Sequence, residues 1–208
     1  MTAGRKSLAE RFDEWAIRHP HTPVLRELLR LPVVLWRLGL GPLVGRFEPR
    51  RGGSLVLLTV TGRSSGLPRH TPVMVHVVGG QTYVWCPYGG RSEWYRNLIA
   101  NPLATVQSRR RTQVVRAASI EDDEAVEVFA ALRRIDELWL RSYLDAEGIG
   151  DTPEDIVRNK QRLHVRRLDS TPEEGPPALK ADLAWLWLVA VAVAAVSVRR
   201  QCRRPAQR

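Results

Sequence analysis

Five short segments between Ser54 and Ser119 are rich in β-branched and apolar residues, and most of the connections between them are short. Their sequences are SLVLLTVT, HTPVMVHVV, QTYVWC, LATVQS and TQVVRAAS. Gly79 and Gly80 separate the second segment from the third and predict a tight hairpin turn. Because short turns join antiparallel neighbours, the pattern predicts a small antiparallel barrel or sandwich, which the later segment LHVRRLDS could close as one last strand.

Helices are predicted beside these strands, which places the chain in the α+β class. The segment SEWYRNLIAN predicts a short helix that ends at Asn101. After Asp122, apolar residues recur at helical spacing and acidic residues cluster in the first turn. A break is expected near Ile135, giving two helices, and Thr152 followed by Pro153 fits the cap and first position of another.

The positive charge of the chain is unevenly distributed. The 208 residues include 32 Lys and Arg and 22 Asp and Glu, a net charge of +10. Residues 1–51 and the last ten residues each carry a net +5, residues 52–116 carry +7, and residues 117–182 carry −7. A general nucleic-acid-binding protein would present a more uniform basic face with a recognisable motif, so we expect no nucleic-acid partner.

Several other classes of site are disfavoured. Cys86 and Cys202 lie 116 positions apart and form neither a disulfide framework nor a zinc site. The five histidines show no metal-ligand spacing, so no metal is expected, and no Ser-His-Asp order appears. The first fifteen residues are polar, with no apolar stretch behind their basic residues, which favours a cytoplasmic protein.

The segment at 24–45 has an apolar helical pattern interrupted by arginines. Two interpretations stay open for it: a helix packed on the domain, or a basic amphipathic segment lying on a membrane surface. Pro32 fits the first turn of a helix better than its middle, which favours two short helices over one long one. Both would belong to a basic N-terminal segment at 1–51.

The apolar stretch at 183–198 contains no charged residue and begins with Trp185 and Trp187. A Pro- and Glu-rich linker at 170–182, expected to have nothing to bury, precedes it, and a basic tail at 199–208 follows it. As a helix it would be about 24 Å long, shorter than the roughly 30 Å hydrocarbon core of a bilayer. We expect an apolar, membrane-associated tail helix that holds the protein on the cytoplasmic face of the membrane, with a buried core helix as the alternative.

The loop that follows the first predicted strand is a candidate anion site. Thr61 to Gly66 form a turn that exposes backbone N–H groups, the hydroxyls of Ser64 and Ser65 and the guanidinium of Arg63. Arg69 follows at the start of the returning strand. Two arginines and two hydroxyls around a glycine-containing turn fit a phosphate or carboxylate. A solvated hairpin loop with incidental charges is the alternative at this point.

A second loop, at 86–90, leads directly into a predicted helix. Its glycines, Gly89 and Gly90, would let a ligand approach the backbone, and a helix N-terminus favours negative charge. Trp94, Tyr95 and Asn97 follow, supplying flat surface and an amide group. One of the two aromatic residues is expected to belong to the core.

These motifs resemble those of the deazaflavin-dependent nitroreductase family of actinobacteria, whose members adopt a split β-barrel fold and use coenzyme F420. The resemblance rests on LLTVTGRSSGLPRHTPV, YGG and WYRNLIANP in order, and covers about residues 54–119. It implies a split β-barrel of the FMN-binding type over 52–169, with N-terminal helices, C-terminal helices and the apolar tail helix. The residues that it implies for binding of the coenzyme are Arg63, Ser64, Ser65, Gly66, Arg69, Thr71 and Pro72 for its phosphate and acidic tail, and Pro87, Tyr88, Gly89, Gly90, Trp94 and Asn97 along its ring.

The resemblance also implies an activity. Reduced deazaflavin would pass a hydride to a hydrophobic, electron-poor acceptor such as a quinone, a nitroaromatic compound or an enone. Trp139 and Tyr143 occupy the place where the family lines its acceptor pocket, although both could simply be core residues. The alternatives are an FMN-binding reductase with the same barrel, and a membrane-anchored protein that binds the cofactor without turnover.

Overall fold

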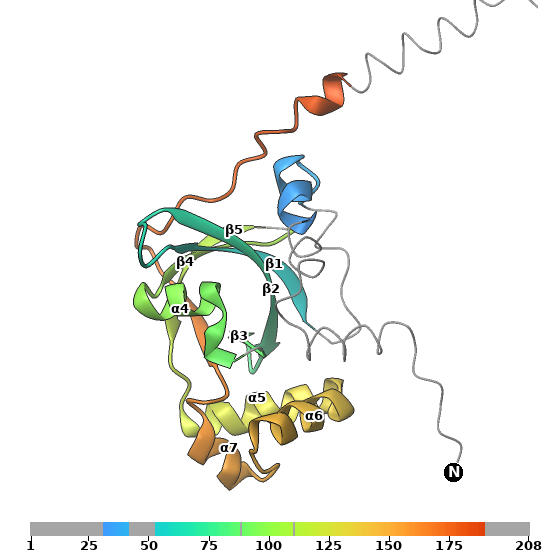
Figure 1. Ribbon diagram of the computed structural model, residues 1–208, viewed down its shortest axis with the longest axis vertical. Coiled ribbons are helices and arrows are strands. Elements are labelled where there is room, and N and C mark those ends of the chain that lie inside the picture. The colour runs from blue at the N-terminus through green and yellow to red at the C-terminus, as the bar shows by residue number, and fades with distance from the viewer. Residues whose placement is uncertain (1–30, 42–52, 88, 110, 190–208) are drawn as a thin grey trace, which may run out of the picture.

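The computed structural model describes residues 31–41, 53–87, 89–109 and 111–189 (Figure 1). Its centre is a closed antiparallel barrel in which the strand order is β1-β2-β3-β6-β5-β4. The strands are β1 (Ser54–Thr61), β2 (Pro68–Val78), β3 (Gln81–Trp85), β4 (Leu103–Gln107), β5 (Thr112–Ala118) and β6 (Val165–Ser170). All six predicted strands are therefore confirmed, and the architecture is a barrel rather than a sandwich.

Strand β6 closes the barrel although it lies about fifty residues after β5 in the chain. It pairs with β3 through Tyr83 and Arg167 and with β5 through Arg116 and Asp169. The β2–β3 hairpin turn forms as expected, because Gly79 and Gly80 have φ angles of 57° and 81°. Two successive positive φ angles match the twist of the flanking strands and are readily adopted by glycine.

The helices lie outside the barrel (Figure 1). A short 3₁₀ turn, η1 (Gly89–Arg91), precedes α4 (Glu93–Ala100), and three helices follow β5: α5 (Asp122–Ile135), α6 (Glu137–Glu147) and α7 (Pro153–Asn159). The predicted break occurs at Asp136, whose side chain accepts a hydrogen bond from the backbone N–H of Trp139 (3.1 Å) and so caps α6. Thr152 caps α7 in the same way, as the sequence predicts.

Two apolar clusters hold this arrangement together. One fills the barrel and includes Val60, Val73, Val84, Leu98 and Val115. The other lies between the outer face of β3 and β6 and helices α5 to α7; its members include Tyr83, Trp85, Phe129, Leu140, Tyr143, Leu144, Leu163 and Val165. Full burial of one such aliphatic or aromatic side chain contributes roughly 1.5–3 kcal/mol before entropy is counted, so the two clusters fix the barrel and the helices relative to each other.

A helical segment at 31–37 covers part of the outside of the barrel. Trp36 is buried there against Leu57 of β1. This packing agrees with the interpretation of 24–45 as a helix that packs on the domain, for the residues that are described. The predicted first of two short helices lies outside the described residues.

The linker prediction for 170–182 is wrong in one respect, because the segment does not hang free. Gln107 of β4 donates from Nε2 to the carbonyl of Leu179 (3.0 Å), and its Oε1 accepts a hydrogen bond from the backbone N–H of Leu179 (2.7 Å). The hydroxyl of Thr105 donates to the carbonyl of Pro176, and Arg116 pairs with Glu173. Residues 171–183, which we call the strap, therefore run along the outside of β4 and β5.

The strap ends at the helical segment 31–37. Arg37 donates from Nε and Nη2 to the two carboxylate oxygens of Asp182 (2.8 and 2.7 Å). The backbone N–H of Leu183 donates to the carbonyl of Arg37 (2.9 Å), and Trp187 Nε1 donates to the carbonyl of Leu38 (2.9 Å). The last carbonyls of a helix have no partner within the helix, so the strap and the residues after it cap the helical segment.

The predicted apolar tail is described only in part. Residues 186–189 are helical, and residues 190–198 and the basic tail at 199–208 lie outside the described residues. In the part of the chain that the structure describes, no helix has both the length and the apolar character needed to cross a bilayer.

Candidate functional site

A cavity of about 590 Å³ opens beside the β1–β2 turn and the first turn of α4. Residues from the turn, from β2, from α4 and from the helical segment 31–37 enclose it. They are Val33, Gly62, Arg63, Ser64, Ser65, Pro68, Arg69, His70, Thr71, Glu93, Trp94 and Asn97. A volume of this size suits a cofactor or drug-sized ligand.

The β1–β2 turn is tightly hydrogen-bonded. The backbone N–H of Gly62 donates to the carbonyl of Leu67 (2.8 Å), and the N–H of Gly66 donates to the carbonyl of Gly62 (2.8 Å). Gly66 has a φ of 67°, and a Cβ on Gly62 would lie 2.7 Å from the hydroxyl of Ser65. Glycine is favoured at Gly66 by its positive φ and at Gly62 by this close approach. The turn presents the side chains of Arg63, Ser64 and Ser65 to the cavity.

Arg63 is held in place from α4. Its backbone N–H and its Nη1 both donate to Oδ1 of Asn97 (3.1 and 3.0 Å), and Nη1 also donates to the carboxylate of Glu93 (2.7 Å). Glu93 and Asn97 lie four residues apart and so occupy one face of α4. The hydrogen bond from Arg63 lowers the pKa of Glu93, which stays ionised at neutral pH. Glu93 therefore offsets the charge of one of the two arginines.

Arg69 lines the cavity from β2. Alternate residues of a strand share a face, so Arg69 and Thr71 lie on the same face as Val73 and Val75, which fill the barrel. The two polar residues thus extend the inner face of the barrel to its rim. Arg69 Nη2 lies 3.5 Å from the hydroxyl of Ser65, and no acidic residue is paired with it among the described salt bridges.

His70 reaches the cavity from the opposite face of β2. Its Nδ1 lies 2.9 Å from the hydroxyl of Thr59, a fully buried residue that is its register partner on β1. Burial lowers the pKa of His70, and the nearby Arg37 lowers it further, so the imidazole is neutral at pH 7. Val33 of the helical segment lines the cavity on this side as well.

The second predicted loop lies away from the cavity. Gly90 packs under the imidazole of His164, where a Cβ would lie 3.0 Å from its Cε1. His164 has a φ of 52°, and its carbonyl accepts a hydrogen bond from the N–H of Cys86 (3.1 Å). Pro87, Gly89 and Gly90 are not among the residues that enclose the cavity, and Tyr88 lies outside the described residues.

Trp94 and Tyr95 divide as expected between site and core. Trp94 lines the cavity, whereas Tyr95 is buried and contacts the rings of Trp94 and His164 edge-on, with centroids 5.7 and 5.3 Å away. The helical period separates the two residues by about 100°, so one faces the cavity and the other faces the protein.

Trp139 and Tyr143 lie in the second apolar cluster, apart from the cavity. Their rings are stacked with centroids 6.1 Å apart, and Trp85 contacts both edge-on at 4.6 and 4.7 Å. Tyr143 is buried, and its hydroxyl has no hydrogen-bond partner within 3.5 Å in the described part of the chain. Burial raises the pKa of Tyr143, and the Trp85 indole acts in the opposite direction, so the phenol stays protonated. The structure thus adds Trp85 to this aromatic group.

The structure brings together seven of the thirteen residues expected to bind the coenzyme. These are Arg63, Ser64, Ser65, Arg69, Thr71, Trp94 and Asn97. Gly66 and Pro72 flank the cavity without lining it, and the loop that contains Pro87 does not join it. Five lining residues were not predicted as ligand contacts: Val33, Gly62, Pro68, His70 and Glu93. Only Glu93 carried a usable signal, because it precedes Asn97 by one helical turn.

The arrangement is suited to a ligand that has both anionic groups and a flat ring. Arg69, Ser64 and Ser65 offer charge-assisted and neutral hydrogen bonds to a phosphate or carboxylate. Trp94 offers an apolar face to a ring. Within the described residues, no group of three or more His, Cys, Asp or Glu side chains could hold a metal ion.

Comparison with known proteins identifies related sequences and structures. A family model described as F420H(2)-dependent quinone reductase matches residues 28–140. The chain is similar to a solved F420-H2 dependent reductase (FDR-A), with 23% identity over 55% of this chain and 93% of that chain and a TM-score of 0.42. It is also similar to a structure described as a domain-swapped dimer, with 20% identity over 55% of this chain and 79% of the other and a TM-score of 0.39. A heme binding protein from Mycobacterium smegmatis is similar at 17% identity over 65% of this chain and 57% of that chain, with a TM-score of 0.34.

Proposed function

The chain belongs to the F420H(2)-dependent quinone reductase family, and from this membership we propose that the cavity beside the β1–β2 turn holds the coenzyme while a quinone-type molecule is reduced. The protein is an oxidoreductase, and its coenzyme is F420. This agrees with the resemblance seen in the sequence and sets aside FMN as the expected flavin.

The observation that carries the proposal is the cluster of anion-binding groups that lines the cavity. F420 is an anionic coenzyme with a phosphate and an acidic tail. Arg63 and Arg69 face the same cavity as the hydroxyls of Ser64, Ser65 and Thr71, and residues 52–116, which supply all five, carry a net charge of +7. The residues present therefore fit this group.

The chain's own residues would bind and orient the coenzyme and exclude water. Arg69 and the two serine hydroxyls would hold the anionic part, and Trp94 would lie against the ring. Asn97 positions Arg63 for the same purpose through its two hydrogen bonds. When bound, the reduced coenzyme supplies the hydride, so no residue of the protein needs to be a nucleophile.

The acceptor is proposed to be a hydrophobic, electron-poor ring of the quinone type, in accord with the family description. Trp139 and Tyr143 remain the proposed acceptor residues, now together with Trp85. The protonated hydroxyl of Tyr143 could donate to an acceptor oxygen. Hydride transfer needs the reacting atoms about 3–3.5 Å apart. A role for these residues therefore requires that the ring of the coenzyme extends from the cavity toward α6.

Titration of F420 against the full-length protein tests the binding site. The Arg63→Ala/Arg69→Ala double variant should bind the coenzyme at least a hundredfold more weakly than the wild type, as judged by quenching of F420 fluorescence. Arg134→Ala on α5 removes the same charge from an exposed site elsewhere and serves as the control. Equal affinity in the double variant and the control would place the coenzyme outside this cavity.

The non-catalytic alternative is tested by the same protein with reduced F420 and menadione. Oxidation of the coenzyme that depends on both protein and menadione supports the reductase. Tight binding of F420 with no oxidation by menadione or by a nitroaromatic acceptor would instead favour a cofactor-binding protein without turnover.

A further inference from the structure

The two described ends of the chain are joined at one end of the molecule, beyond the barrel (Figure 1). Trp187 and Leu183 cap the carbonyls of Leu38 and Arg37, and Arg37 forms a two-pronged ion pair with Asp182. The close approach extends to Gly39, where a Cβ would lie 3.6 Å from the side chain of Ala184. The helical segment 31–37 and residues 183–189 therefore act as one structural unit.

This unit exposes an apolar surface. Seven large side chains on it are exposed, and we call them the terminal apolar surface: Leu31, Val34, Trp185, Leu186, Trp187, Leu188 and Val189. Leu188 is 75% exposed and Trp185 is 56% exposed. Isolated exposed apolar residues are ordinary, but a group of them drawn from two distant segments that hold each other in place is typical of an interaction surface.

We propose that the terminal apolar surface docks on an anionic lipid bilayer. The sequence that follows the terminal apolar surface indicates a bilayer more specifically than the surface alone does. Residues 190–198 contain no charge, and the ten residues after them contain five arginines and no acidic residue. The segment thus has tryptophans first, an apolar run next and arginines last. This order is typical of segments that lie at the boundary between the acyl chains and the anionic headgroups of a bilayer. A protein partner would not require the arginines to follow an uncharged run.

The docking surface is connected to the cavity through the helical segment. Val33 lines the cavity, one residue before Val34 of the terminal apolar surface. Contact with the bilayer would therefore occur on the segment that forms one wall of the site.

Sedimentation with vesicles tests the proposal on the full-length protein. Vesicles of phosphatidylcholine with 30% phosphatidylglycerol should carry the wild type down, and pure phosphatidylcholine vesicles should carry down less. Trp185→Ser/Leu188→Ser should reduce the bound fraction at least tenfold, and Leu31→Ser/Val34→Ser should reduce it at least threefold. Neither pair removes a hydrogen bond that joins the two segments. Val77→Ser/Leu138→Ser, which removes two exposed apolar side chains from β2 and α6, should bind like the wild type.

Three outcomes would overturn the proposal. Wild-type protein that does not sediment with anionic vesicles has no lipid-docking surface. Binding that survives both pairs of substitutions but is abolished by 0.5 M salt would belong to the arginines alone. A wild type that is dimeric in analytical ultracentrifugation and becomes monomeric in Trp185→Ser/Leu188→Ser, with no binding to vesicles, would assign the surface to a second copy of the chain. Coenzyme binding is a separate readout, so failure here leaves the reductase assignment intact.

Discussion

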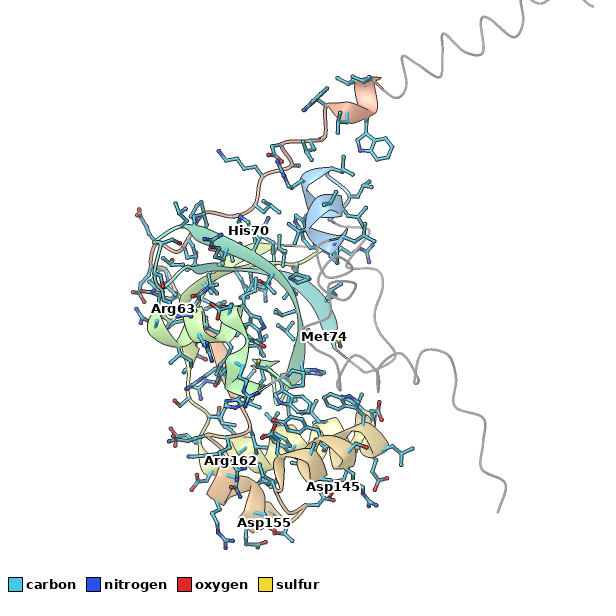
Figure 2. All side chains as sticks on the ribbon, in the orientation of Figure 1. Arg63, His70, Met74, Asp145, Asp155 and Arg162 are labelled. Atoms are coloured by element: carbon cyan, nitrogen blue, oxygen red, sulfur yellow. The ribbon has the colours of Figure 1, made fainter. Side chains whose placement is uncertain are left out.

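Asn97 holds Arg63 at two points, because one amide oxygen accepts hydrogen bonds from both the backbone N–H and the guanidinium of the arginine. The β1–β2 turn and α4 are thereby tied together at the cavity (Figure 2 labels Arg63). Asn97 is buried, so water cannot readily replace its oxygen.

Asn97→Ala is expected to weaken F420 binding by about tenfold. The substitution leaves the N–H of Arg63 without its acceptor and frees the guanidinium, which corresponds to the loss of one to two hydrogen bonds. Fluorescence titration measures the affinity, and thermal unfolding checks that the protein remains folded. Asn97→Asp keeps an acceptor oxygen, so it should preserve the turn while its added charge still repels the coenzyme; wild-type affinity in both variants would contradict the assignment.

Glu93→Gln is expected to act in the opposite direction and strengthen F420 binding roughly two- to fivefold at low salt. The carboxylate of Glu93 pairs with Arg63 and competes with an anionic ligand for it. The gain should shrink in 0.5 M salt, where exposed charges are screened. Glu137→Gln removes an exposed carboxylate paired with Arg141 on α6 and should change nothing. An unchanged or lower affinity in Glu93→Gln would mean that Glu93 does not compete with the coenzyme.

Gln107→Ala is expected to release the strap from the barrel. The buried amide of Gln107 makes two hydrogen bonds to Leu179, and their loss should cost about 1–3 kcal/mol of local stability. Faster amide hydrogen exchange at Leu179 and faster proteolysis within 171–183 would report the release. Gln81→Ala, at an exposed position of β3, is the control. Unchanged exchange at Leu179 would show that other contacts hold the strap.

The free energy of unfolding is expected to fall as the pH drops below about 6.5. Burial lowers the pKa values of His70, His76 and His164, so the unfolded chain binds protons in this range that the folded protein does not. Stability is therefore complete above the unfolded pKa and is lost as the pH falls toward the folded values. Urea unfolding at pH 7.5, 6.5 and 5.5 measures the slope, and His76→Gln should flatten it. The lowered pKa of Glu124 acts only at lower pH, because an ordinary glutamate titrates near 4.3.

Tyr143→Phe separates an acceptor role from a core role. The buried hydroxyl has no partner within 3.5 Å in the described chain, so its removal should leave the free energy of unfolding within about 0.5 kcal/mol of the wild type or raise it. If the hydroxyl donates to the acceptor, kcat/KM for menadione should fall about tenfold while F420 affinity stays constant. Unchanged kcat/KM would assign Tyr143 to the core alone.

The strands and helices could be predicted from the sequence because their signals are local. Gly79-Gly80, the Thr152-Pro153 start and the break at Asp136 each depend on a few neighbouring residues. The strap could not be predicted, because it binds the barrel largely through its own backbone, at the carbonyls of Pro176 and Leu179. A Pro- and Glu-rich composition carries no sign of such contacts.

The candidate site was predictable only where its residues share one turn. Arg63, Ser64, Ser65 and Arg69 lie within seven positions, so their proximity follows from the hairpin itself. His70 and Val33 line the same cavity from the outer face of the barrel, beyond its rim. Their position depends on how the helical segment 31–37 packs on the barrel. The loop containing Gly90 was expected to join them, but its 3₁₀ turn packs under His164 instead.

The ion pair between Arg37 and Asp182 spans 145 positions of the chain, which has a consequence for synthesis. At translation rates of about 5–20 residues per second, the helical segment leaves the ribosome roughly 7–30 s before the residues that cap it. During that interval, water must donate the hydrogen bonds to the last carbonyls of the helical segment. Trp36 is buried only after β1 and the strap have been synthesised. The wall of the cavity is thus among the last parts of the molecule to be completed, so a nascent chain would carry its anion-binding turn well before it could enclose a ligand.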